Sequence, residues 1–222
     1  MAAGHAGTAL LPHSLLLRCI GRVAFPLFCF LLVQDLLSEG RLLPRAVGLV
    51  LLAAAAEIPF NLLTFGRLFC ADEQSVAVSF LFSLPSVIFY RLDEKNPLPV
   101  MAALLPCCLL CMLFKGCYGW LGPVLCAGFC LARGRRIQPA LICFISCLLY
   151  SLALLASGLE GQWIIVSLAS CLAAVPILLA GNRSCLCRSR AGTLLFYLAY
   201  PLSLLFFTWL RTSRLIPPYF FE

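Results

Sequence analysis

Charged residues are scarce in this sequence, and their scarcity excludes a protein that folds in water. Asp, Glu, Lys and Arg make up 11% of the 222 residues, whereas 63% are hydrophobic and the mean hydropathy is +1.02. Soluble domains carry about a quarter charged residues and about half apolar ones. Apolar stretches also recur along the whole chain, which excludes a secreted protein with one cleaved leader. The sequence therefore predicts an integral membrane protein.

Histidine is also scarce, and this limits what the 14 cysteines can do. The two histidines, His5 and His13, both precede the first long apolar stretch. A metal site would need histidine or carboxylate partners beside the thiols. Within apolar segments cysteine behaves as a small hydrophobic residue. We therefore predict no metal site.

The apolar stretches lack the alternation of period two that lipid-facing barrel strands show. Continuous apolar runs of about 20 residues are typical of helices that cross about 30 Å of hydrocarbon. We therefore predict an all-α, polytopic membrane bundle that forms a single domain over residues 1–222. The eight predicted spans are Ser14–Leu37, Arg45–Leu63, Ser75–Tyr90, Leu98–Phe114, Tyr118–Ala132, Gln138–Ser157, Gln162–Ala180 and Gly192–Leu210.

Lys and Arg are distributed unevenly among the breaks between these spans. Ten fall in the breaks that begin at Ser38, Arg91, Arg133 and Gly181, and four fall in the alternate segments. Short cytoplasmic loops carry the excess of positive charge, so these four breaks are predicted inside and both termini outside. The net charge of +7 follows from this asymmetry and does not indicate nucleic-acid binding.

Two ionisable residues lie inside the predicted spans. Arg22 is eight residues into the first span and Glu57 is six residues before the end of the second. At 1.5 Å per residue, both lie about 9–12 Å from the predicted outer face. An ionisable group at such depth costs about 3 kcal/mol on insertion scales, so it usually faces a partner inside the bundle. Arg22 and Glu57 are therefore candidates to pair, either to fix helix register or as part of a site.

Other polar residues occur at the same predicted level. They are Asn61, Gln74, Lys115 and Tyr118. Together with the charged pair they predict a polar pocket that opens to the outside. The alternative is that Gln74, Lys115 and Tyr118 are ordinary anchors at the membrane interface. Spacing alone does not distinguish the two or name a reaction.

Several motifs resemble those of the TraX family, in the same order and at about the same separation. The two most specific are the run Ile20-Gly21-Arg22-Val23-Ala24-Phe25-Pro26-Leu27-Phe28-Cys29-Phe30-Leu31-Leu32-Val33 and the segment Glu57-Ile58-Pro59-Phe60-Asn61. Weaker matches are Gln74-Ser75-Val76, Tyr118-Gly119-Trp120-Leu121-Gly122 and Phe196-Tyr197-Leu198-Ala199-Tyr200-Pro201-Leu202. The resemblance runs from about Arg18 to Leu210.

The resemblance implies acyl transfer in a bacterial inner membrane, because the named member of the family acetylates the N-terminal amine of conjugative pilin. The implied donor is acetyl-CoA, and the implied partners are membrane lipid and a protein or glycan acceptor at the outer face. Arg22 would hold the oxyanion or a phosphate, and Glu57 would orient it or act as the base. The implied substrate-binding residues are Asn61, Gln74, Lys115, Tyr118, Tyr197 and Tyr200.

The chain departs from the family pattern at four places. The family shows Asp where this chain has Cys117, His where it has Ser203, and Asn where it has Ser75. Only about 13 residues precede the first span, so a first helix with an Asp-His pair is expected to be absent. An inert homologue therefore stays open beside the enzyme. A small-solute transporter is a third possibility, but the internal repeats typical of transporters are not found.

Overall fold

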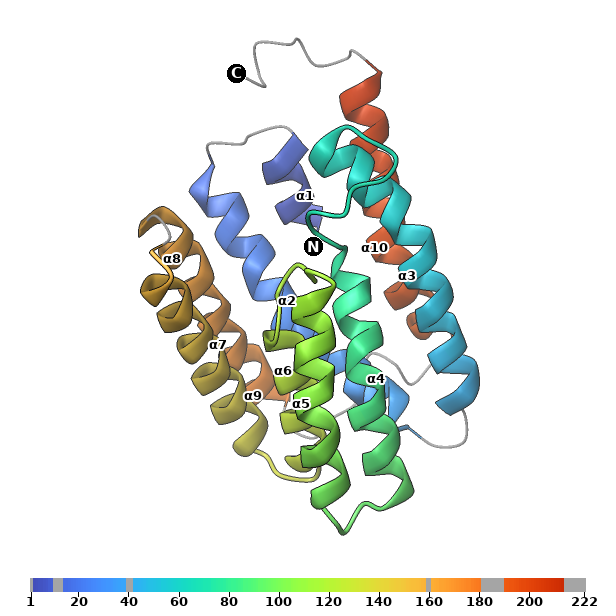
Figure 1. Cartoon of the computed structure of the whole chain (residues 1–222), viewed down its shortest axis with the longest axis vertical. Helices are drawn as coiled ribbons and strands as arrows, with labels where there is room; N and C mark the ends of the chain where they lie inside the picture. Colours follow the sequence, from blue (N-terminus) through green and yellow to red (C-terminus); the bar gives the residue numbers. More distant parts are fainter. Residues whose placement is uncertain (1, 10–13, 39–41, 159–160, 181–189, 214–222) are drawn as a thin grey trace.

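The computed structural model describes residues 2–9, 14–38, 42–158, 161–180 and 190–213, all in helices and the turns between them (Figure 1). Most helices run along the long axis of one bundle. In chain order they are α1 (Ala2–Ala9), α2 (Leu15–Leu36), α3 (Leu42–Phe65), α4 (Val76–Leu92), α5 (Leu98–Leu113), α6 (Leu121–Leu131), α7 (Gln138–Ala156), α8 (Gly161–Leu168), the 3-10 helix η1 (Ala169–Ala173), α9 (Ala174–Ala180) and α10 (Arg190–Thr212).

All eight predicted spans coincide with helices, which confirms the polytopic membrane bundle. Four helical segments are long and apolar enough to cross a membrane, namely α2, α3, α7 and the continuous segment Gly161–Ala180. Shorter apolar helices fill the other four predicted spans. Two helices begin three residues away from the predicted bound: α3 begins at Leu42 and not at Arg45, and α6 begins at Leu121 and not at Tyr118. Gly119 in the preceding turn has a φ of 48°, a backbone conformation that a helix does not contain.

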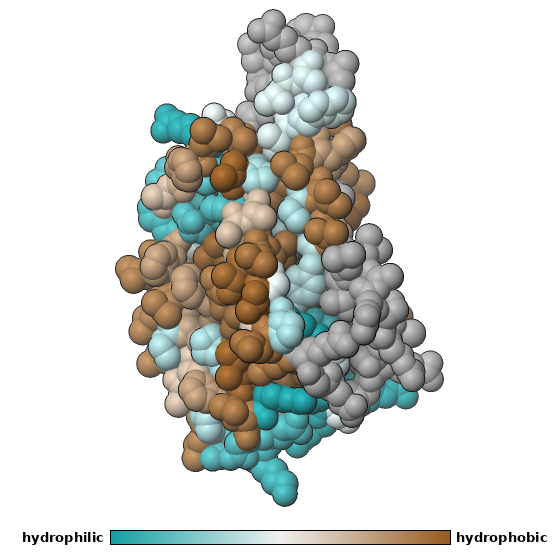
Figure 2. Space-filling model, turned by 90° about the vertical axis from the view of Figure 1, so that its right-hand side faces the viewer, coloured by the Kyte–Doolittle hydropathy of each residue, from teal (hydrophilic) through white to brown (hydrophobic). Residues whose placement is uncertain are grey.

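The outer surface of the bundle is apolar over much of its height. On the face seen in Figure 2, hydrophobic side chains cover a broad area across the middle and hydrophilic ones gather at the lower end. Large side chains such as Leu51, Leu105 and Leu179 are more than 60% exposed. A soluble protein rarely exposes so much contiguous apolar surface, whereas lipid solvates it. The helices therefore present leucine to the lipid.

Small residues bring α1 close to α2. A Cβ added to Gly21 would lie 2.6 Å from the Cα of Gly4, so only glycine permits this approach of the two backbones. Such close contacts between small residues are a general means of packing helices in membranes. Helix α1 also contacts α10 and α3, so it is held among three helices near one end of the bundle (Figure 1).

Two loops are joined by backbone hydrogen bonds at the same end of the bundle. Gln74 donates its backbone N–H to the carbonyl of Lys115 at 3.0 Å and accepts from the backbone N–H of Cys117 at 3.2 Å. Gly116, between these partners, has no room for a side chain, because a Cβ would lie 2.8 Å from Cys111 Sγ and from Ser79 Oγ. This bridge holds the residue before Gln74 against the turn that precedes α6.

Candidate active site

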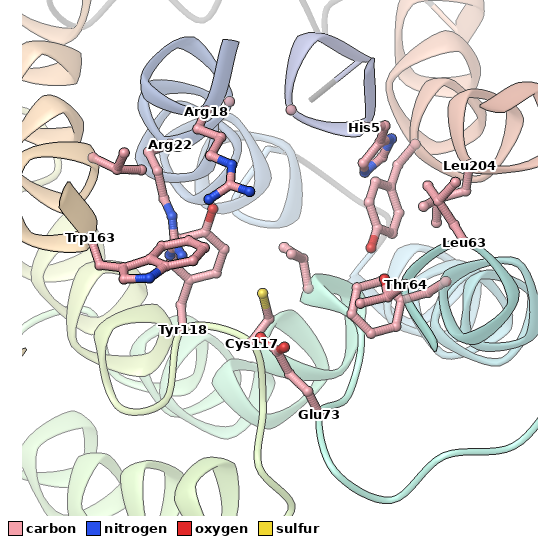
Figure 3. Close-up of a pocket in the computed structure, with 16 residues that line it drawn as sticks. His5, Arg18, Arg22, Leu63, Thr64, Glu73, Cys117, Tyr118, Trp163 and Leu204 are labelled. Carbon is pink, nitrogen blue, oxygen red and sulfur yellow. The ribbon is translucent and has the colours of Figure 1, made fainter. Parts of the chain in front are cut away.

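A pocket of about 290 Å³ opens among the helix ends that meet near α1 (Figure 3). It is lined by Gly4, His5, Arg18, Gly21, Arg22, Phe60, Leu63, Thr64, Glu73, Val76, Cys117, Tyr118, Trp163, Val166, Tyr200 and Leu204. The arginines lie on one side of the pocket and His5 on the opposite side, with Glu73 and Cys117 between them. Three of the residues named from the sequence are therefore brought together: Arg22, Tyr118 and Tyr200.

His5 is oriented by two hydrogen bonds in series. Its Nδ1 lies 3.0 Å from Ser203 Oγ, and that hydroxyl donates to the carbonyl of Tyr200 at 2.8 Å. Because the hydroxyl proton is used by the carbonyl, the hydroxyl oxygen accepts and Nδ1 is the donor. The neutral ring then carries its lone pair on Nε2. Sequence reasoning did not assign His5 to the site, although the flanking Gly4 and Gly7 are a signal of close helix packing.

Burial keeps His5 neutral. Helix α1 is too short to span a membrane, and desolvation of its imidazole lowers the pKa of His5 from 6.5 to about 4. Removal from water disfavours the charged form of histidine. At neutral pH the unprotonated imidazole is therefore available to take a proton.

The two arginines rest on aromatic rings. The guanidinium of Arg18 lies 4.6 Å from the ring centroid of Trp163, and that of Arg22 lies 4.7 Å from the ring centroid of Tyr118. The Tyr118 ring is fixed in turn by Phe25, which stacks on it at 3.7 Å between centroids and 4° between planes. Stacking and cation–π contact hold each guanidinium in place without neutralising its charge.

Glu73 supplies the carboxylate of the pocket and lies against the thiol of Cys117 (Figure 3). The backbone bridge of Gln74 explains this contact, because it places the neighbouring residue Glu73 beside the turn. Burial, and then the negative charge of Glu73, raise the pKa of Cys117 well above its ordinary value. The thiol therefore stays protonated and is a poor nucleophile. Among the described residues, no group of three or more His, Cys, Asp or Glu is placed to hold a metal ion.

Arg22 and Glu57 form no ion pair, so the candidate pairing is wrong. All salt bridges among the described residues lie elsewhere. Glu57 Oε2 instead accepts the backbone N–H of Ser75 at 3.2 Å, at the start of α4. A carboxylate at this position stabilises the positive end of the helix dipole. Two inward-facing groups at the same depth can lie on different sides of a bundle, which hydropathy cannot show.

The other residues named from the sequence lie outside the pocket lining. Asn61 is buried. The backbone of Gln74 forms the bridge between the two loops, and its side-chain amide donates a hydrogen bond to the carbonyl of Cys70 at 3.2 Å. Lys115 is exposed and pairs with Asp72 at 3.9 Å. Tyr197 donates to Asp35 Oδ2 at 3.1 Å, beside the contact of that carboxylate with Arg45 at 3.4 Å. Asp35 follows Arg22 by 13 residues, or about 20 Å along α2.

Two of the positions at which the sequence departs from the family pattern take part in these contacts. The helix that precedes α2 is α1, which carries His5 but no Asp. Its imidazole bonds the hydroxyl of Ser203, which stands where the family has histidine. Glu73 brings a carboxylate to Cys117, which stands where the family has Asp. His13 lies outside the described residues.

Comparison with known proteins gave one match. The model of a family described as TraX protein matches residues 1–211. Comparisons with curated proteins and with solved structures gave no match.

Proposed function

Because the chain belongs to the TraX family, we propose that it is a membrane acyltransferase that moves an acetyl group from acetyl-CoA to an amine or hydroxyl. The observation that carries the proposal is the orientation of His5. Its Nδ1 bonds Ser203, its Nε2 makes no hydrogen bond with a described residue, and two guanidinium groups face it across the pocket. These are a base and cations for the oxyanion, the two kinds of group that acyl transfer requires.

The reaction follows from this arrangement. As the acceptor nitrogen or oxygen attacks the acetyl carbonyl carbon, Nε2 of His5 takes the proton that the acceptor loses. The negative charge that develops on the carbonyl oxygen is stabilised by Arg22, which Tyr118 holds in position. The carbon–sulfur bond then breaks, and the imidazolium returns its proton to the leaving thiolate. Free CoA and the acetylated acceptor are formed, and the enzyme is unchanged.

The size of the pocket suits the reacting ends of the substrates. At about 290 Å³ it is at the small end of the range of ligand pockets, about 300–1,000 Å³. An acetyl thioester and an amine or hydroxyl fit this volume, whereas a whole CoA molecule would extend beyond it. The asymmetry of Lys and Arg supports a plasma-membrane protein with both termini outside and the pocket toward the outer face.

The test is release of free CoA by the purified protein in lipid nanodiscs, with a panel of peptide amines and sugar hydroxyls as acceptors. We expect release that requires both acetyl-CoA and an acceptor. His5→Asn keeps a donor near the Nδ1 position but removes the base, so it should lower kcat by about 100-fold or more. Ser203→Ala should reduce the rate less, because the imidazole loses its orientation but stays in the pocket.

Three results would contradict the proposal. Full activity of His5→Asn would exclude His5 as the base. If the folded wild-type protein releases no CoA with any acceptor of the panel, the result would favour an inert homologue. Uptake of acceptors into sealed vesicles without their acetylation would favour a transporter.

A further inference from the structure

The pocket carries more positive charge than its own acid can balance. Its described lining holds two arginines, one carboxylate and a neutral imidazole. No described carboxylate lies within 4.0 Å of either guanidinium, because the described salt bridges of the protein involve other residues. Glu73 lies against Cys117 and not against the arginines.

Arg22 is partly buried, and the groups that touch its guanidinium are neutral, while the negative charge of Glu73 attracts it at longer range. They are the face of Tyr118 and the hydroxyl of Tyr150. Burial of a cation without an anion is costly, and proteins offset the cost with a paired counter-charge or with a ligand. Here Glu73 is the one carboxylate of the described lining and forms no ion pair with either arginine, so a ligand anion would complete the site.

Arg18 and Arg22 stand four residues apart on α2, so they project from one face of the helix. Figure 3 shows both side chains beside Trp163 and Tyr118 on the same side of the pocket. Each ring occupies one face of its guanidinium, and the N–H groups at the edge of the plane stay available. Two such edges match a group with several acceptor oxygens and a charge near −2.

We infer that Arg18 and Arg22 form a binding site for a phosphate ester or diphosphate group of a substrate. The inference rests on the proposed function for the molecule that carries the phosphate. That molecule is either the donor, since CoA contains a diphosphate and a phosphate ester, or a lipid whose headgroup bears phosphate. In both cases the arginines bind the anion and His5, on the opposite side, acts on the acceptor. Arg22 then binds the phosphate in place of the carbonyl oxyanion that the proposed function assigns to it.

The experiment measures equilibrium binding to the wild-type protein in phosphatidylcholine nanodiscs, without turnover. The probes are inorganic pyrophosphate, CoA and pantetheine, which lacks phosphate; nanodiscs doped with phosphatidic acid supply the lipid source. The variants are Arg18→Gln and Arg22→Gln. Arg67→Gln is the matched control, because Arg67 is exposed near the same end of the bundle and does not line the pocket.

We expect pyrophosphate to bind, with a Kd raised roughly tenfold or more in each pocket variant and unchanged in Arg67→Gln. Binding of CoA with the same dependence, and no binding of pantetheine, would assign the phosphate to the donor. Failure of CoA to bind, with displacement of pyrophosphate by phosphatidic acid, would assign it to a lipid.

The site is excluded if no phosphate-bearing probe binds in a way that depends on both arginines, even when acetyl transfer is observed. Conversely, arginine-dependent binding without any acetyl transfer would support the anion site and contradict the proposed function. Thermal unfolding is recorded for each variant. If Arg22→Gln does not fold, Arg22→Lys replaces it, and the loss of the planar fork should still weaken binding measurably.

Discussion

The hydroxyl of Ser203 decides which nitrogen of His5 is reactive. It donates to the carbonyl of Tyr200 and so accepts from Nδ1, which leaves Nε2 for the chemistry. Burial acts on the same ring in a second way, since it lowers the pKa to about 4. The two effects together give a base that is neutral and oriented throughout the physiological range.

This predicts an unusual pH profile for acetyl transfer to a sugar hydroxyl, which does not itself titrate near neutrality. A base is active when unprotonated, so activity should be constant from pH 8 down to about pH 5 and should fall only near pH 4. The measurement is kcat/KM against pH in nanodiscs, with thermal unfolding as the control for stability. A fall in kcat/KM already near pH 6.5, the ordinary pKa of histidine, would show that His5 is solvated during turnover.

At the scale of elements, the site depends on how closely α1 approaches α2. The Cβ of any larger residue at position 21 would meet the backbone of Gly4 at 2.6 Å, and a backbone atom cannot move aside as the end of a side chain can. Displacement of α1 would carry His5 away from Ser203. The geometry of the base is thus set by a glycine contact outside the reacting groups.

Gly21→Val is therefore expected to lower kcat by about tenfold or more while the protein still inserts, because a misplacement of about 1 Å can cost 100-fold in rate. The matched control is Gly48→Val on α3, where an added Cβ meets no atom within 4 Å. CoA release and thermal unfolding are measured for both variants. Equal activity of the two would show that α1 does not position the base.

The helical spans were predictable, because each apolar run is long and the bilayer fixes the length that it must have. The contacts of the site were only partly predictable. Hydropathy gives the depth of Arg22 and Glu57 but not the rotation of their helices, and the candidate ion pair fails for that reason. Glu73 reaches Cys117 through a bridge between two loops, which no periodic pattern reports. Helix α1, with eight residues, is too short to register as a span.

At the scale of the whole molecule, the two ends of the bundle differ. The candidate site lies at one end. At the other end, arginines link the helices: Arg91 and Arg133 both donate to the carbonyl of Leu37, at 3.2 Å and 2.9 Å, and Arg45 pairs with the buried Asp35. The prediction that this end is cytoplasmic rests on the same basic residues.

The orientation predicts which loops a membrane-impermeant reagent reaches in intact cells. An epitope inserted after Asp72, in the loop that leads to the pocket, should be accessible from outside, whereas one inserted after Lys95, between α4 and α5, should require permeabilised cells. Antibody labelling before and after permeabilisation is the measurement. The reverse pattern would place the pocket on the cytoplasmic side, where acetyl-CoA is made.

The hydrogen bond between His5 and Ser203 joins residues 198 positions apart, from the first and the last described helices. Because α1 is synthesised first and α10 last, His5 has no Ser203 to bond while the intervening helices enter the membrane. A chain that stops before position 203 contains the base and both arginines but cannot orient the imidazole. The proposed activity would therefore arise only at the end of assembly, and an unfinished chain in the membrane would lack the complete site.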